Sequence, residues 1–304
     1  MNNRFFTHIL FSACLLTPAA AWAGASGAGA MLKLGAGARA SALSEAFTAG
    51  SGDPSVMFFN PAGLAYEKGS AAMATHALWF ESVHYTVAAY NRHTPKYGTF
   101  GIGLQALSYG DITSVDNTGV ADGTFSPRDL ALTAGLGRDI NEKLTAGAQA
   151  KYLYSKIDNS ASALLVDLGA QYRHNSLTAG LAIQNAGTKL KYNSESESVP
   201  TQLRLGAAYG WSKITAYGDL NLPSDAKTWL ALGVEYKAYT ADNITGMLRA
   251  GYSTRANDAR NDKTFPFSLG LGLSKDKFAL DYAFVPYGDL GQTHHITLGM
   301  RWGL

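Results

Sequence analysis

Apolar and polar residues alternate along most of this chain, and the alternation continues into its last residues. In the final segment His, Thr, Gly and Arg occupy one face, and the other face carries Ile296, Leu298, Met300, Trp302 and Leu304. A period of two is typical of a β-strand with two different faces. Fourteen such segments start near residues 71, 84, 97, 128, 143, 163, 176, 201, 213, 228, 244, 265, 277 and 293. Most of them run for about ten residues, the length of a tilted strand that crosses a bilayer.

The connections between these segments carry a second signal. After the first hairpin, short turns such as Lys275–Asp276 alternate with longer connections, of which Ser108–Pro127 is the longest. Short periplasmic turns and longer outer loops are the outer-membrane pattern, and an even strand number places both termini in the periplasm. The sequence therefore predicts an all-β fold: a transmembrane antiparallel up-and-down barrel of about 14 strands in a bacterial outer membrane.

A soluble β-sandwich or a repeat array would also alternate, but it would turn its apolar face inward. Here the polar face is too rich in glycine to form a packed core; examples are Gly101, Gly103, Gly135, Gly147, Gly206 and Gly251. An apolar face against lipid and a polar, glycine-lined lumen fit this pattern better.

The first 70 residues have a different texture. Residues 1–23 are expected to be a signal peptide that is removed, with Arg4 before an apolar run and Ala21-Trp22-Ala23 as the cleavage site. Cys14, the only cysteine, lies within it; a lipoprotein cleavage box there is a weaker alternative. Residues 24–70 are rich in Gly and Ala, with a helix-like pattern from Ala38 to Ala49. The barrel then comprises residues 71–304.

Composition excludes several classes of protein. Charged residues make up 16% of the chain and the net charge is +2, so no nucleic-acid footprint is expected. No stretch approaches the roughly 18 consecutive apolar residues that a membrane-spanning helix needs.

The last strand also matches the spacing of a barrel-assembly signal, a polar residue, a glycine and two apolar residues: Thr297, Gly299, Trp302 and Leu304. An unpaired edge strand can pair with the insertion machinery. Barrel-assembly machinery and outer-membrane lipid are therefore expected partners.

Three stretches together resemble the PorV/PorQ family, a branch of the FadL-like outer-membrane barrels. They are Leu32–Ala40 running into Ala46–Ala49, then Asp53–Ala65 with its Asn-Pro-Ala-Gly-Leu sequence, and Asp281–Gly291 followed by Thr293-His294. With the fourteen strands, the resemblance covers essentially the whole mature chain.

The resemblance implies a fourteen-stranded barrel whose N-terminal segment folds into the lumen as a hatch. The Asn-Pro-Ala motif of FadL-like barrels belongs to this hatch, so the hatch and ligand-path candidates are Phe58, Phe59, Asn60, Pro61 and Ala62. A Gly/Ala-rich segment can also approach a glycine-lined wall closely, because neither side has bulk. A purely structural loop is an equally open interpretation of this motif.

Charged residues of both signs fall on the predicted lumen face. They are Asp129, Lys151, Asp167, Arg173, Arg204, Glu235, Lys237, Arg249, Asp281 and Arg301, and Gln149 lies among them. Unpaired charges in a narrow interior are expensive. A paired network that braces barrel and hatch is therefore favoured over a selectivity filter, which would carry one sign.

Nothing in the sequence points to catalysis or to a cofactor. His294 and His295 are adjacent on one strand and point to opposite faces, so they cannot readily chelate one metal. No Gly-x-Ser-x-Gly elbow is present, and Gly35–Ala38 lacks the strand–helix unit and lysine of a nucleotide loop. No catalytic residue, metal or cofactor is expected.

Two functions remain open. The first is a hatch-plugged barrel that binds a small hydrophobic molecule or passes it across the outer membrane. The second, suggested by PorV/PorQ members that serve type IX secretion, is an accessory role that handles exported cargo at the outer membrane. FadL-type fatty-acid channels are longer and have large apolar outer loops, whereas Ser108–Pro127 is mostly polar.

Overall fold

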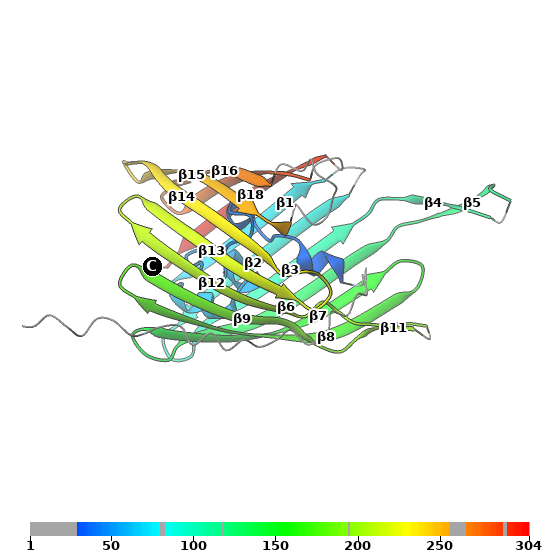
Figure 1. The fold of residues 1–304 in the computed structure, drawn as a ribbon, viewed down its shortest axis with the longest axis horizontal. Coiled ribbons are helices and arrows are strands. Elements are labelled where there is room, and N and C mark those ends of the chain that lie inside the picture. Colours follow the sequence, from blue (N-terminus) through cyan, green and yellow to red (C-terminus); the bar gives the residue numbers. More distant parts are fainter. Residues whose placement is uncertain are drawn as a thin grey trace, which may run out of the picture.

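A computed structural model describes residues 29–79, 83–116, 118–193, 195–255, 266–287 and 291–303. The strands form one closed antiparallel barrel in the order β1-β18-β17-β16-β15-β14-β13-β12-β9-β8-β7-β6-β3-β2 (Figure 1). Fourteen barrel strands confirm the predicted count. Among the described residues, no helix is both long and apolar enough for a membrane span.

The barrel strands begin close to the predicted positions, with a largest difference of three residues at Ser160, predicted at 163. Their bounds are β1 Ser70–Leu78, β2 His84–Thr94, β3 Gly98–Ser108, β6 Arg128–Asp139, β7 Leu144–Lys156, β8 Ser160–His174, β9 Leu177–Gly187, β12 Gln202–Trp211, β13 Ile214–Pro223, β14 Trp229–Ala241, β15 Ile244–Ser253, β16 Phe267–Lys275, β17 Phe278–Pro286 and β18 Gln292–Trp302.

Two further hairpins extend from one end of the barrel. They are formed by β4 (Ile112–Val115) with β5 (Ala121–Phe125), and by β10 (Leu190–Tyr192) with β11 (Glu195–Glu197). Figure 1 shows the β4–β5 hairpin projecting well beyond the barrel strands. This end is called the hairpin end, and the opposite end, where β1 begins and β18 finishes, is called the turn end.

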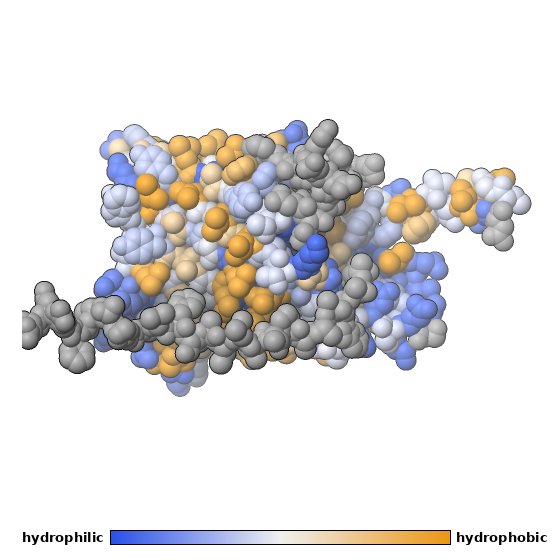
Figure 2. Space-filling view, in the orientation of Figure 1, coloured by the Kyte–Doolittle hydropathy of each residue, from blue (hydrophilic) through white to orange (hydrophobic). Residues whose placement is uncertain are grey.

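The faces of the strands are sorted as the alternation predicts. Leu164 and Leu298 on the outer face are 63% and 61% exposed, whereas Asp167 and Arg204 on the inner face are 0% and 3% exposed. In Figure 2 apolar residues lie along the middle of the barrel wall, and hydrophilic residues are more frequent toward the ends. A soluble β-sandwich would bury its apolar face and expose its polar face, so this alternative is excluded.

The lumen is filled by the hatch (residues 29–69). It contains η1 (Ala30–Lys33), α1 (Ala38–Ala42), η2 (Pro54–Phe58) and η3 (Pro61–Tyr66). The helix predicted for residues 38–49 was too long. The backbone turns at Ser44 and Glu45, whose φ angles of 52° and 66° are left-handed, so the helix cannot continue past them.

Candidate functional site: the hatch and two cavities beside it

One half of the hatch, η2 with η3, is wedged against a wall of glycines. A Cβ built on Gly103 would lie 2.7 Å from Phe58 Cζ, and one on Gly137 would lie 2.7 Å from Leu64 Cβ. On Gly147 and Gly169 it would overlap the hatch backbone or a hatch side chain. Real Cβ atoms do not approach so closely, and the wall therefore accepts this half of the hatch only because those positions lack side chains.

Asn60 ties this half to both the wall and the rest of the hatch. Its Oδ1 accepts from the backbone N–H of Ala62 at 3.0 Å, which caps η3 after Pro61. Its Nδ2 lies 2.9 Å from Thr48 O, 3.2 Å from Ala170 O and 3.3 Å from Leu181 O. Since Asn60 is completely buried, its side chain is an anchor in the interior.

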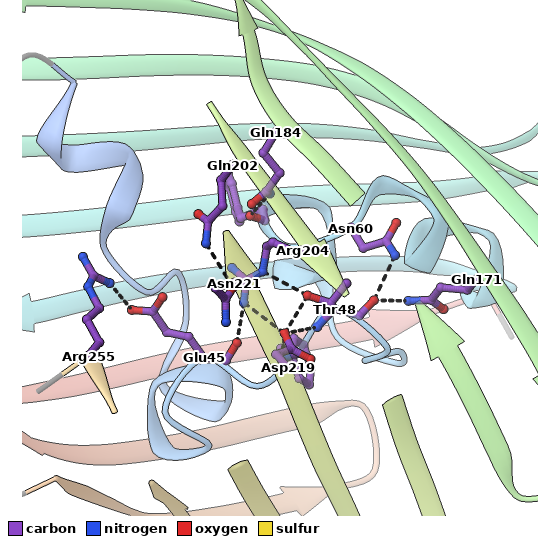
Figure 3. Close-up of polar contacts among 12 residues, drawn as sticks. Glu45, Thr48, Asn60, Gln171, Gln184, Gln202, Arg204, Asp219, Asn221 and Arg255 are labelled. Carbon is purple, nitrogen blue, oxygen red and sulfur yellow. Dashed lines mark hydrogen bonds and ion pairs between the residues drawn. The ribbon is translucent and has the colours of Figure 1, made fainter. Parts of the chain in front are cut away.

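A second anchor is Asp219 of β13, shown in Figure 3. Its Oδ2 accepts from the backbone N–H groups of Phe47 (3.1 Å) and Thr48 (3.0 Å) and from the Thr48 hydroxyl (2.6 Å). The Arg204 guanidinium lies 3.0 Å from the same oxygen and also donates to Glu45 O at 2.6 Å. A buried carboxylate with a cation and several N–H donors is well compensated, so Phe47 and Thr48 are fixed to β12 and β13.

The other half, α1 and the turn after it, contacts β15–β18 mainly through small groups. The exception is the buried Leu43, whose side chain lies against Gly233 of β14 and whose backbone lies against Gly251 of β15. Ala42 packs against Gly270, and the Ala38 N–H donates to the Thr297 hydroxyl at 2.8 Å. Ser268 Oγ donates to Ala42 O at 2.9 Å and lies 2.8 Å from Ser44 Oγ. Methyl groups against glycine bury little apolar area, so this contact contributes less than the wedge of η2 and η3.

The main ionic tether of α1 is Arg39. Its guanidinium makes two bonds of 2.9 Å to Glu235 of β14, donates to Ser51 O at 3.0 Å and lies 5.1 Å above the Phe47 ring. Burial disfavours its charge, but Glu235, Tyr217 and Asp53 together outweigh burial and raise the pKa of Arg39 above its ordinary value. Glu235 has a second cation, Arg249, at 2.7 Å.

A cavity of about 240 Å³ opens beside the hatch at the hairpin end. Its apolar wall comprises Trp229, Phe267, Val285, Pro286 and Tyr287. Its hatch wall includes Ser41, Ser44 and Glu45, with Lys33 and Arg255 at the rim. Burial raises the pKa of Glu45, and the nearby Arg255 and Arg204 oppose this effect.

A second cavity of about 610 Å³ lies at the turn end. Arg39 and the hatch residues 51–54 line it, together with Arg249 and Asp281 from the wall and the exposed turn at Asp276 and Lys277. The two cavities follow the same strands, β15–β18, on either side of α1. The region between them is occupied by the small contacts of Ala38 and Ala42.

The predicted lumen charges form local groups. Arg249 contacts Glu235 and also Asp281 (2.5 Å), whereas Asp167 pairs with Lys151 (2.6 Å) and Arg204 with Asp219. Arg173 lies 3.8 Å above the Tyr66 ring, and Arg301 contacts the hatch at Gly52 O and, at 3.8 Å, Glu67. Most of these groups meet the hatch or hold a residue that does.

Lys237 is exposed, unlike the other charges of the lumen set that lie deeper in the barrel. It lies near the turn end of β14 opposite Met247, which lines the turn-end cavity, and the strand bulges only after it. Arg39 and Asp219 were missed by the sequence reasoning. Asp219 sits at an inward position of an alternating strand and could have been found by parity, but nothing local identifies its hatch partners.

Of the motif residues, Phe58 and Phe59 are buried in the hatch core, and Pro61 and Ala62 begin η3. None of these four, nor Asn60, lines either cavity. Their contacts describe a structural anchor, and the ligand-path role of the motif stays a prediction.

In the predicted assembly signal, Thr297 points inward to α1, Gly299 lines the turn-end cavity and Trp302 stacks on Tyr90 at 5.9 Å. Leu304 lies outside the described residues. The assembly role stays a prediction.

His295 is buried beside Ser41 and Thr293, whereas His294 lies against Tyr282. The described part of the chain contains no group of three or more His, Cys, Asp or Glu residues placed to hold a metal ion.

Comparisons with known proteins agree with this architecture. The family model described as "Type IX secretion system protein PorV" matches residues 23–220. The Ralstonia pickettii toluene transporter TbuX is 16% identical, with a TM-score of 0.57 over 86% of this chain and 98% of that chain. A Pseudomonas aeruginosa FadL homologue is 13% identical, with a TM-score of 0.56 over 88% and 98%. No curated protein sequence matches.

The closed fourteen-stranded barrel with its hatch has the same fold as this toluene transporter and this FadL homologue. Because the family model covers more than half of the chain, the protein belongs to the PorV family. The solved structures are too dissimilar in sequence to carry more than the fold.

Proposed function

We propose that this protein binds a small hydrophobic molecule in the hairpin-end cavity and passes it inward beside the hatch. The observation that carries the proposal is the cavity itself, with its wall of Trp229, Phe267 and Tyr287 and a polar edge on the hatch. A concave, mostly apolar site with a few polar groups is the usual form of a small-molecule site. The toluene transporters of the same fold support this ligand class.

The proposed orientation places the hairpin end outside the cell and both termini in the periplasm. It rests on the long extensions at the hairpin end and the short turns at the other. A ligand would then enter near the β4–β5 and β10–β11 hairpins and meet the hatch next.

Fluorescence titration with the neutral aromatic probe 1-N-phenylnaphthylamine tests ligand binding on protein purified in mild detergent. Trp229→Ala should weaken probe binding by roughly threefold to tenfold, because one well-packed aromatic contact contributes about 0.5–1.5 kcal/mol. Trp211→Ala, which changes a tryptophan 70% exposed at the turn end, is the matched control and should leave affinity unchanged. Absence of saturable binding, or equal effects of the two variants, contradicts the proposal.

A second candidate is an accessory role in protein secretion, supported by the PorV family. The β4–β5 hairpin carries Ile112, Val115 and Val120 at 42%, 60% and 62% exposure, and it stands clear of the barrel (Figure 1). Exposed apolar side chains on a projecting hairpin suit contact with another protein.

Affinity purification with and without residues 112–125 tests the secretion role. A secretion partner or surface cargo should be recovered with the intact chain and lost with the deletion. Recovery of only barrel-assembly factors and chaperones by both would reject it.

A further inference from the structure

The two cavities are separated by one short piece of the hatch. Ser41, Ser44 and Glu45 line the hairpin-end cavity, and Arg39 lines the turn-end cavity. These residues belong to one segment of seven positions, 39–45. The way between the cavities therefore depends on α1 and the turn after it, and the remaining hatch need not move.

The barrel wall beside this segment carries very small residues. Between the cavities β15, β16 and β17 present Gly251, Gly270 and Ala283 to the lumen. Gly251 faces Leu43 and Ser44 of the hatch, and Gly270 faces Ala42. Ala283 packs against Ala38 and Ala42. At these three positions the wall carries nothing larger than a methyl group, so withdrawal of α1 would leave an opening there, bordered by Ser268 and Thr297.

The segment is bounded by backbone positions that favour a change of direction. Gly37, before α1, has a φ of 97°, a conformation that is costly for any residue with a Cβ. After α1, Ser44 and Glu45 have φ angles of 52° and 66°, which are uncommon for residues other than glycine. Beyond them the chain is fixed again, because Asp219 holds Phe47 and Thr48.

The strongest tether of the segment can be released without stranding a charge. Glu235 binds Arg39 through both oxygens, but it also accepts from Arg249 at 2.7 Å. After Arg39 leaves, Glu235 therefore keeps a cation, and the Arg39 side chain enters the turn-end cavity that it already lines. Breaking a buried pair is costly chiefly when one partner stays buried without a counter-charge. Here Glu235 keeps Arg249, which it shares with Asp281, and the Arg39 guanidinium moves into the cavity.

We propose that residues 38–45 are the gate of the barrel, and that release of Arg39 from Glu235 lets this segment withdraw and joins the two cavities into one passage. The gate rests on the proposed transport function, and it adds that the Asn60-Pro61-Ala62 half of the hatch stays in place during passage. Ligand in the hairpin-end cavity touches Ser41, Ser44 and Glu45, so it contacts the moving segment directly.

Arabinose flux into proteoliposomes tests the gate with a probe that needs no apolar site. Arg39→Ala should raise the flux about tenfold or more over the unaltered protein, a change that corresponds to only about 1.4 kcal/mol. Lys68→Ala is the matched control, because Lys68 forms an ion pair with Asp139 in which both side chains are about half exposed. It should leave the flux unchanged.

A disulfide supplies the reverse test. Ser44 Oγ and Ser268 Oγ are 2.8 Å apart, so cysteines at both positions can form a bond of about 2.05 Å with little movement. The only natural cysteine, Cys14, lies in the predicted signal peptide. In the Arg39→Ala background, oxidised Ser44→Cys/Ser268→Cys should return the flux to the unaltered level, and reduction should raise it again.

Equal flux in Arg39→Ala and Lys68→Ala, or an oxidised disulfide without effect, overturns the gate. If Arg39→Ala does not insert, Arg39→Lys, which keeps the charge but loses the two-bond geometry, takes its place in both measurements. Should neither variant insert, the disulfide in the otherwise unaltered protein decides: oxidation must lower the arabinose flux below that of the reduced form, and an unchanged flux overturns the gate. Binding of 1-N-phenylnaphthylamine, measured on the same proteins, separates the gate from the proposed ligand binding. If the probe does not bind but the flux changes as expected, only the proposed ligand class is contradicted.

Discussion

The two halves of the hatch meet the same kind of wall in opposite ways. Residues 54–66 fill the spaces left by Gly103, Gly137 and Gly147 with bulky side chains and backbone, and Asn60 adds hydrogen bonds. Residues 38–45 bring one bulky side chain, Leu43, against Gly233, set a methyl group against Gly270, and have a cavity on each side. A glycine-lined wall therefore fixes a segment only where the segment brings enough volume to fill it.

The same contrast separates the polar contacts. In the fixed half, the amide of Asn60 and the carboxylate of Asp219 bind backbone groups, which cannot rotate away. In the other half, the principal tether joins two long side chains, Arg39 and Glu235, and Glu235 has a second partner. Side-chain pairs can exchange partners, whereas a backbone clamp is released only when the segment itself unfolds.

The largest expected effect is from removal of the Asn60 clamp. Asn60→Ala leaves the buried Ala62 N–H without its acceptor and removes one of the two donors to Thr48 O, which keeps Gln171. These losses, with the cavity left by the side chain, should lower the free energy of unfolding by about 3 kcal/mol. Guanidinium-induced unfolding in detergent micelles measures it, with the exposed Asn159→Ala as control. If the two variants have the same stability, the fixed half is not anchored as described.

The next effect concerns the motions of the two halves in the unaltered protein. Hydrogen exchange of backbone amides in residues 54–66 should require an opening free energy at least about 2 kcal/mol larger than exchange in residues 38–45. Excess 1-N-phenylnaphthylamine should slow exchange in residues 38–45 and leave residues 54–66 unchanged. Equal protection of the two segments would show that both halves of the hatch are held equally firmly.

The smallest effect is a pH dependence in the mobile half. Burial raises the pKa of Glu45, so ionising it costs more in the folded than in the unfolded state. This loss of stability is fully present above the folded pKa, shrinks as the pH falls below it, and is gone below the lower pKa of the unfolded state. Glu45→Gln should therefore be slightly more stable than the unaltered protein at pH 8, with the difference vanishing at acid pH, as measured by denaturant unfolding.

The matched control for this experiment is Glu142→Gln, at an exposed turn position. A variant Glu45→Gln that is less stable at pH 8 would mean that the ion pair with Arg255, at 3.7 Å, outweighs burial. Glu45 would then be a further tether of the mobile half.

The barrel was predictable because its signal is local. A β-strand puts every second side chain on the same face. The lipid-facing position of Leu164 and the lumen-facing position of Asp167 can therefore be predicted from whether their numbers are even or odd. The strand starts, the count of fourteen and the inside-out polarity follow from it. The presence of a hatch came from the resemblance at Asp53–Ala65 and from the Gly/Ala-rich texture of the N-terminal segment.

The tertiary structure alone decided which hatch residue meets which wall residue. Arg39 is 196 positions from Glu235, and Thr48 is 171 positions from Asp219, so no spacing in the sequence relates them. The two cavities are likewise volumes that remain after the hatch has packed, and no single segment encodes them. The sequence determined the barrel through the period of its backbone, and packing across the lumen determined where the hatch is fixed and where space is left beside it.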